Sequence, residues 1–258
     1  MNRLAQSALL FLLGATLLHA GTTDLYLRYV KEGLRPLVLL AGAVLVVTAA
    51  ATLHYDRRGR ASAPHPSQRH PSQRHPSEHH RPEHHRPEHH HEPRVAWLLT
   101  LPVLALILVA PPALGSYSAS HTGTALTKPL GFPDLPAGDP LHLGVADYAG
   151  RAIYDKGRSL RDRDLRITGF VTLDRDGTPY LVRMGLNCCA ADAQPVKIAL
   201  TGAVPPVLRP DTWLEITGRY TPRRTEDPVN GRPVPYVQVT AARPVPTPRD
   251  PYDETWNS

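Results

Sequence analysis

Three long apolar runs without a charged residue constrain this chain more than any other feature. They cover Leu4–Ala20, Leu37–Leu53 and Val95–Tyr117, with lengths of 17, 17 and 23 residues. A helix needs about 20 apolar residues to cross the hydrocarbon core of a bilayer, within a range of about 17 to 25. We therefore predict a membrane protein with transmembrane helices at about residues 4–20, 37–53 and 95–117, the first two within residues 1–55.

Two alternatives compete with this interpretation. The first run starts with Arg3 and ends in small residues, as a cleaved signal peptide does. Against that alternative, the second run follows after only sixteen residues, which favours a helical hairpin. The second and third runs lack an amphipathic face, which disfavours burial in the core of a soluble protein.

Basic residues predict the orientation of these helices, because connections rich in Lys and Arg stay in the cytoplasm. The first connection holds three such residues, and the second, residues 56–94, holds eight arginines. We therefore expect a multi-pass protein of the cytoplasmic (inner) membrane, with a cytoplasmic N-terminus. Everything after about residue 118 is then extracytoplasmic. Cleavage of a signal peptide would leave two helices and the same final sidedness.

A repeat with histidine at every fifth position, interspersed with prolines, occupies residues 65–93 of the second connection. The repeat has no apolar position, which predicts a disordered segment without a packed core. Neutral imidazole binds divalent metal ions such as Zn²⁺, Ni²⁺ and Cu²⁺, and a flexible segment binds them weakly because ordering it costs entropy. A repeat without a metal function is the alternative. The candidate ligands are His65, His70, His75, His79, His80, His84, His85, His89, His90 and His91.

Residues 141–248 carry the patterns of a mainly-β extracytoplasmic domain, between a Gly- and Pro-rich linker at 118–140 and a tail at 249–258. Five short strands, with glycine inside the first and the fourth, predict a small closed barrel of the OB type. A β-sandwich fragment is the alternative. The pattern predicts a short helix around residues 145–153, and strands at 165–173, 179–184, 196–200, 213–220 and 236–241, with Asp-Gly and Asn-Gly turns before the second and the fifth.

One segment of this domain does not resemble a structural loop. It reads R-M-G-L-N-C-C-A-A-D-A, and it places Cys188, Cys189 and Asp192 within five residues. Two thiolates and a carboxylate are three ligands for a soft or borderline metal ion such as zinc. A strained redox pair and two buried small side chains are the alternatives. A ligand or redox role predicts accessible thiols, at least one of them with a depressed pKa.

The order of these parts resembles the YcgQ-type permease subunits of bacteria. The resemblance covers nearly the whole chain and is carried by Arg183, Cys188, Cys189, Ala191 and Asp192, together with residues 213–218. It implies a small membrane protein that acts with a separate multi-helix permease of YcgR type, in a system linked to the homeostasis of zinc or another divalent metal. The family defines no catalytic residue.

Composition and motifs argue against several other functions. The net charge of +6 comes from arginines scattered among acids, without a row of exposed aromatic side chains, so we expect no nucleic-acid partner. We find no nucleophile–base constellation, HExxH or phosphate loop, and therefore expect no enzyme. Three helices without a charged pathway are too few for a complete transporter. We expect an accessory subunit of a membrane permease; a membrane-anchored metal or thiol sensor, or a thiol enzyme, is the alternative.

Overall fold

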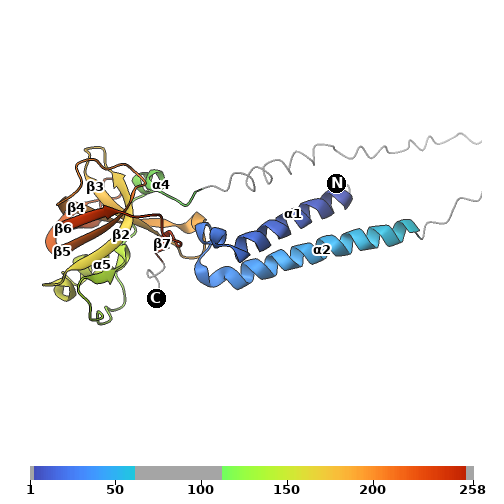
Figure 1. The fold of residues 1–258 in the computed structure, drawn as a ribbon, viewed down its shortest axis with the longest axis horizontal. Coiled ribbons are helices and arrows are strands. Elements are labelled where there is room, and N and C mark those ends of the chain that lie inside the picture. Colours follow the sequence, from blue (N-terminus) through green and yellow to red (C-terminus); the bar gives the residue numbers. More distant parts are fainter. Residues whose placement is uncertain (1–2, 62–111, 254–258) are drawn as a thin grey trace, which may run out of the picture. The chain divides into compact units, whose positions relative to one another are not determined.

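The computed structural model describes residues 3–61 and 112–253, and the chain forms two compact units (Figure 1). The helical unit consists of Met1–His19 and Leu39–Ala110, and the barrel unit of Ala20–Val38 and Pro111–Ser258. Residues 20–38, which connect the first two helices, therefore belong with the barrel; we call them the connecting segment. The histidine repeat and residues 95–111 of the third predicted span lie outside the described residues.

The first two apolar runs form helices, as the sequence predicts. Helix α1 covers Arg3–Thr22 and α2 covers Arg35–Ala61. A Cβ atom at Gly14 would lie 2.9 Å from the carbonyl oxygen of Gly42. Small residues allow two helix backbones to approach closely, which is typical of helix packing in membranes.

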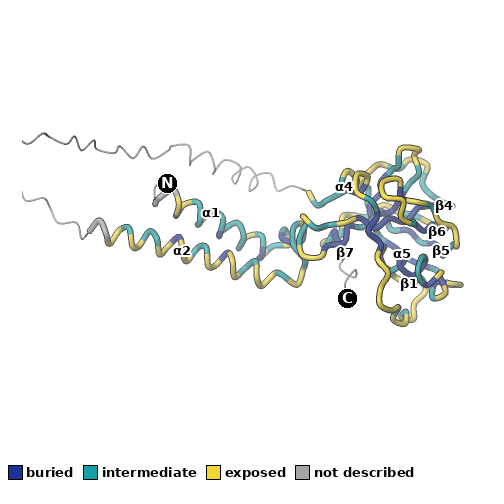
Figure 2. The backbone as a smooth tube through the Cα atoms, turned by 180° about the vertical axis from the view of Figure 1, so that it is seen from behind, coloured by how far each residue is buried: buried dark blue, intermediate teal, exposed yellow. Residues whose placement is uncertain are grey.

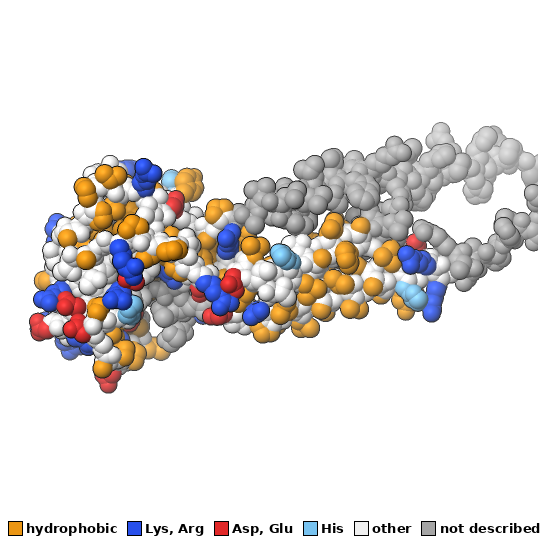
Figure 3. All heavy atoms as spheres, in the orientation of Figure 1, with side chains coloured by type: hydrophobic (Ala, Val, Ile, Leu, Met, Phe, Trp, Pro, Cys, Tyr) orange, Lys and Arg blue, Asp and Glu red, His pale blue; other side chains and the backbone are white. Residues whose placement is uncertain are grey.

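Large apolar side chains cover the outer surface of these helices (Figure 3). Within α2, Leu40, Val44 and Val47 are 60%, 55% and 66% exposed, which a water-soluble helix avoids. Among the described residues, one helical stretch is long and apolar enough to cross a membrane. It covers Glu32–Arg58 and includes most of α2. A shorter apolar stretch, Gln6–Thr22, lies within α1. An apolar helix near the N-terminus fits a membrane anchor, and a signal sequence passes the same test.

The end of the third predicted span differs from the expectation. Residues 112–115 are not helical, and a separate short helix, α4, covers Ser116–His121. Pro112 has no N–H group to donate, and a proline ring disrupts the preceding helical turn. The helix predicted for residues 95–117 therefore does not continue unbroken to Tyr117.

Five strands of the barrel unit close into a barrel (Figure 1). Around the barrel the order is β2, β3, β4, β6, β5 and back to β2, and all neighbours are antiparallel except β4 and β6. The five predicted strands are confirmed, and closure of the sheet makes the β-sandwich alternative wrong. The strands are β2 Leu165–Leu173, β3 Pro179–Gly185, β4 Gln194–Gly202, β5 Trp213–Glu226 and β6 Pro233–Pro244.

Strand β2 closes the barrel because it pairs with different neighbours along its length. Its first residues pair in parallel with β1, Leu141–Leu143, and its last residues pair with β3. A Cβ atom at Gly169, between these two pairings, would lie 2.7 Å from the carbonyl oxygen of Val182. Glycine is therefore required where β2 changes partner. A two-residue strand, β7 Tyr252–Asp253, pairs in parallel with β3.

A helix covers one end of the barrel and completes its core (Figure 2). Helix α5, Val145–Tyr154, contacts all five barrel strands and confirms the predicted helix. Its Tyr148 is fully buried and donates a hydrogen bond of 2.6 Å to the carbonyl oxygen of Tyr236. A partner for the hydroxyl removes the free-energy cost of burying it.

A buried ion pair fixes part of the predicted linker to the barrel. Lys197 Nζ lies 2.8 Å from Asp227 Oδ2, and the two side chains are 3% and 0% exposed. Asp227 also accepts hydrogen bonds from the backbone N–H groups of Thr124, Val229 and Asn230. The stretch that the sequence predicts as a linker at 118–140 therefore packs on the barrel at Thr124.

Candidate metal centre

The C-C-A-A-D-A motif lies in the loop between β3 and β4. A short 3-10 helix, η5, covers Ala190–Asp192 and turns the carboxylate back toward the two cysteines. Cys188 is exposed and Cys189 half-buried, and both are free thiols. The two Sγ atoms and a carboxylate oxygen of Asp192 all lie within 4.8 Å of one another. The thiols are therefore accessible, as a ligand or redox role requires. The alternative of two buried cysteines is wrong.

The spacing of these three atoms is close to that of a metal site. With Zn–S bonds of about 2.3 Å and Zn–O bonds of about 2.0–2.2 Å, ligand atoms of a tetrahedral site lie about 3.4–3.8 Å apart. Side-chain rotations that shorten the observed separations by up to about 1.4 Å bring the three atoms to that geometry. The residues therefore fit a soft or borderline divalent metal ion, which would supply a Lewis acid with a position left for a further ligand.

Asp192 is held in place by its own loop. Its Oδ1 accepts a hydrogen bond of 3.0 Å from the backbone N–H of Asn187, and its Oδ2 accepts one of 2.9 Å from that of Cys188. A carboxylate has about four acceptor sites, and Asp192 also accepts hydrogen bonds from the Cys188 thiol and from the backbone of Cys189. Hydrogen bonds of this kind orient a carboxylate in metal sites, and here they also give Asp192 a role in shaping the loop.

Protonation of the cluster differs from the sequence-based expectation. The hydrogen bond from the Cys188 thiol to Asp192, with smaller contributions from Cys189 and from nearby charge, raises the pKa of Cys188 to about 11. The same hydrogen bond, with the backbone donors, lowers the pKa of Asp192. The sequence predicts a depressed pKa for at least one of the two thiols, and in the metal-free loop Cys188 is not that thiol, because the neighbouring carboxylate repels a thiolate. A bound cation reverses this effect, since it replaces the proton.

The loop is docked on the connecting segment, a contact that the sequence does not reveal. Val30 and Cys189 form an isolated antiparallel bridge. The N–H of Lys31 donates to the carbonyl oxygen of Cys188 at 3.2 Å, and the N–H of Ala190 donates to that of Tyr29 at 2.7 Å. The carbonyl oxygen of Cys188 and the N–H of Ala190, on either side of Cys189, are therefore hydrogen-bonded to the segment that connects α1 and α2.

Two further contacts hold the connecting segment on the barrel unit. Asp24 forms an ion pair of 2.6 Å with Arg249, at an exposed position where such a pair adds little stability. The hydroxyl of Tyr252 donates to the carbonyl oxygen of Arg28 at 2.9 Å and accepts from the N–H of Leu114 at 3.2 Å. Tyr252 thus connects β7, the connecting segment and the chain before α4.

Arg183, which the motif includes, has a structural role. Its guanidinium donates to the carbonyl oxygens of Asp250 and Tyr252, and it stacks over the ring of Trp213 at 5.1 Å. These bonds hold β7 beside β3, and therefore indirectly hold Tyr252. Ala191, another motif residue, is exposed in η5 and offers no ligand.

No histidine of the described residues belongs to this cluster. The ten histidines from His65 to His91 lie outside the described residues. The His121 ring is hydrogen-bonded to the carbonyl oxygen of Tyr117 and to the hydroxyl of Ser120, both within α4. The His142 ring is hydrogen-bonded to the guanidinium of Arg166. Among the described residues, the only group of three metal-ligating side chains is the one formed by the two cysteines and Asp192.

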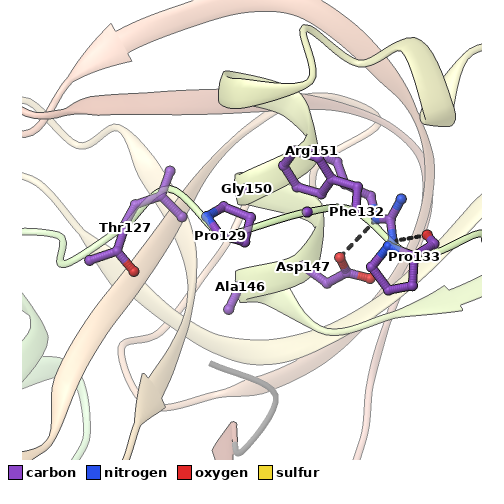
Figure 4. A pocket seen from close by; sticks show the side chains of 10 residues that line it. Thr127, Pro129, Phe132, Pro133, Ala146, Asp147, Gly150 and Arg151 are labelled. Carbon is purple, nitrogen blue, oxygen red and sulfur yellow. Dashed lines mark hydrogen bonds and ion pairs between the residues drawn. The ribbon is translucent and has the colours of Figure 1, made fainter. Parts of the chain in front are cut away.

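A hollow of about 260 Å³ beside α5 is a weaker candidate (Figure 4). Its charged side chains, Arg151 and Asp147, pair with each other at 2.8 Å, and Arg151 also donates to Ser159 and to the carbonyl oxygen of Pro133. Ligand pockets are usually about 300–1,000 Å³ with unpaired polar groups that orient a ligand. The paired charges of this hollow instead hold Pro133 against α5.

The fold and the cluster together define a barrel domain with a thiol–carboxylate loop between two strands. Residues 145–253 match the family model of the DUF1980 C-terminal domain, which covers α5, the whole barrel and β7. This match fits the resemblance to the YcgQ-type family. Comparisons with curated proteins and with solved structures give no match.

Proposed function

We propose that this protein is an accessory subunit of a membrane permease that handles zinc or a related divalent metal ion. The observation that carries the proposal is the docking of the Cys188–Cys189 loop on residues 29–31 of the connecting segment. With α1 and α2 inserted in a bilayer, this segment emerges at the membrane surface. The metal centre is then held at the surface, within reach of a membrane-embedded partner.

Further features support a partner in the membrane. The exposed apolar side chains of α2 give it a surface for lipid or for another helix. The proposal includes three spans, an inner-membrane location and an extracytoplasmic barrel, as the distribution of arginine predicts. It also includes weak metal binding by the cytoplasmic histidine repeat, which would act as a buffer beside the permease.

The topology of the barrel supports the OB-type assignment within this proposal. Strands in chain order 1-2-3-5-4 close into a Greek-key barrel, with the third and fifth strands parallel. Such barrels serve many functions, so the fold alone does not choose between them. The thiol–carboxylate loop favours metal over an oligonucleotide or a sugar, because these ligands need stacking aromatic side chains or hydrogen-bonding groups.

A sensor without transport activity is the second candidate, favoured by the exposure of Cys188. Both candidates bind metal, but only an accessory subunit changes the transport of metal across the membrane. Measurement of ⁶⁵Zn²⁺ transport in cells that lack the protein separates them. We expect changed transport in these cells, and restoration by the wild-type chain.

The variant for this experiment is Cys188→Ser/Cys189→Ser, which should fail to restore transport. The matched control is Asp176→Asn, an exposed carboxylate in the turn between β2 and β3, which should restore it fully. Transport that does not depend on the protein, together with altered transcription of metal-responsive genes, would contradict the permease proposal and support the sensor.

A further inference from the structure

We propose that Cys188, Cys189 and Asp192 bind a single exchangeable cation of the Zn²⁺ or Cd²⁺ type, and that this cation strengthens the docking of the connecting segment on the barrel. The inference rests on the proposed function in taking a metal ion as the ligand. It adds the number of ions bound, the exchangeability of the ion and the element that responds to it.

The exposure of the site indicates an exchangeable ion. Structural zinc sites are closed, with four protein ligands, whereas sites that exchange a ligand keep a position open. The described part of the chain supplies three ligands here, and the Cys188 side chain is exposed to solvent. The remaining position is therefore accessible to water or to a ligand from a partner. Because the ligands lie in a loop at the surface, the ion reaches them and leaves them without unfolding of the barrel.

The response of the connecting segment follows from which backbone groups hold it. The carbonyl oxygen of Cys188 accepts the hydrogen bond from Lys31, and Cys189 is the bridge partner of Val30. A cation held by both Sγ atoms restricts the backbone of these two residues. The bridge then forms with a smaller loss of conformational entropy, so metal binding and docking favour each other.

The coupling is reciprocal and works through a small set of bonds. The hydrogen bond from Lys31 is the longer of the two, at 3.2 Å against 2.7 Å for the bond from Ala190 to Tyr29. It is also the bond whose acceptor, the carbonyl oxygen of Cys188, belongs to a proposed metal ligand. We therefore expect the amide of Lys31 to show the largest change when the cation binds.

Titration of the full-length chain in detergent micelles with Cd²⁺ tests the ligand set. The charge-transfer absorption of a Cd–thiolate bond reports this site alone, because the chain has two cysteines and imidazole gives no such band. We expect saturation at a ratio of one cation per chain. Asp192→Asn should lower the affinity by about tenfold or more, since even the loss of an outer partner costs 10–100-fold. The control Asp176→Asn should bind as the wild type does.

Hydrogen exchange in the same samples tests the coupling. Saturation with Cd²⁺ should slow exchange of the Lys31 and Ala190 amides severalfold and leave the amides of α5 unchanged. Absence of the thiolate band overturns the inference, and so does a full band with unchanged exchange at both amides. A band without any effect of the protein on ⁶⁵Zn²⁺ transport contradicts the proposed function and leaves the site intact. If ⁶⁵Zn²⁺ transport depends on the protein but the Cd–thiolate band is absent, the proposed function stands and the inferred metal site is wrong.

Discussion

The carboxylate of Asp192 should slow the reaction of Cys188 with alkylating reagents in the metal-free protein. The pKa of Cys188 is raised to about 11, first by its hydrogen bond to Asp192 and then by Cys189. A negative neighbour disfavours the thiolate, which is the reactive form. Asp192→Asn in a Cys189→Ser background removes both main causes and leaves Cys188 as the only thiol. Its reaction should therefore be faster.

The size of the effect follows from the two pKa values. At pH 8 a thiol with a pKa of about 11 is about 0.1% thiolate, and a thiol at the ordinary value of about 8.5 is about a quarter thiolate. Intrinsic nucleophilicity falls by roughly 10- to 20-fold over this range, with a Brønsted coefficient of about 0.4–0.5. The net acceleration on removing the whole effect is roughly 12- to 25-fold.

Iodoacetamide labelling followed by mass spectrometry measures this rate, with a chelator present to keep metal out. The matched control is Asp176→Asn in the same Cys189→Ser background, whose Cys188 keeps the Asp192 carboxylate and should therefore react more slowly than in the Asp192 variant. The pH at which the rate reaches half its maximum should also fall in the Asp192 variant. An equal or slower rate at pH 8, with the barrel shown to be folded by circular dichroism, would refute the role of this carboxylate.

Three other predictions test separate parts of the molecule. Lys197→Met leaves Asp227 buried without its counter-charge and should lower the free energy of unfolding of the barrel by about 3–5 kcal/mol, measured by urea denaturation. The control Lys156→Met, at an exposed position, should change this free energy little. Ser258→Cys, with the native cysteines replaced by serine, should react with a membrane-impermeant reagent on intact cells; labelling only after lysis would reverse the topology. A peptide of residues 63–93 should bind several Zn²⁺ ions weakly at neutral pH and lose them as the pH falls through about 6.5, because ligation needs neutral imidazole; calorimetry without heat at millimolar metal would contradict this.

The barrel strands were predictable because their signals are local. Residues 165–173 alternate in the strand pattern, and the turn at Asp174–Gly177 follows with Gly177 at a φ of +83°, where glycine is favoured. The extension of β5 to Glu226 was not predictable, because its last residues are held by pairing with β6 beyond a bulge. Strands β1 and β7 have three and two residues, too few for any alternation, and they exist only through pairing with distant strands.

The members of the candidate site were predictable, but their surroundings were not. Cys188, Cys189 and Asp192 are close in the sequence, so a loop brings them together. The bridge between Cys189 and Val30 uses backbone groups, which every residue type supplies and no sequence pattern marks. The direction of the Cys188 pKa also required the structure, because the carboxylate that completes the ligand set also disfavours the free thiolate.

The hydrogen bond from Tyr252 to Arg28 sets a delay in the biogenesis of this protein. The two residues are 224 positions apart, and synthesis at about 5–20 residues per second takes roughly 10 to 45 s to pass from one to the other. Throughout that interval the connecting segment exists without β7, whose Tyr252 holds it, and this segment includes Tyr26 and Leu27, which are buried in the finished fold. A newly made chain therefore presents this segment to its surroundings well before it can dock.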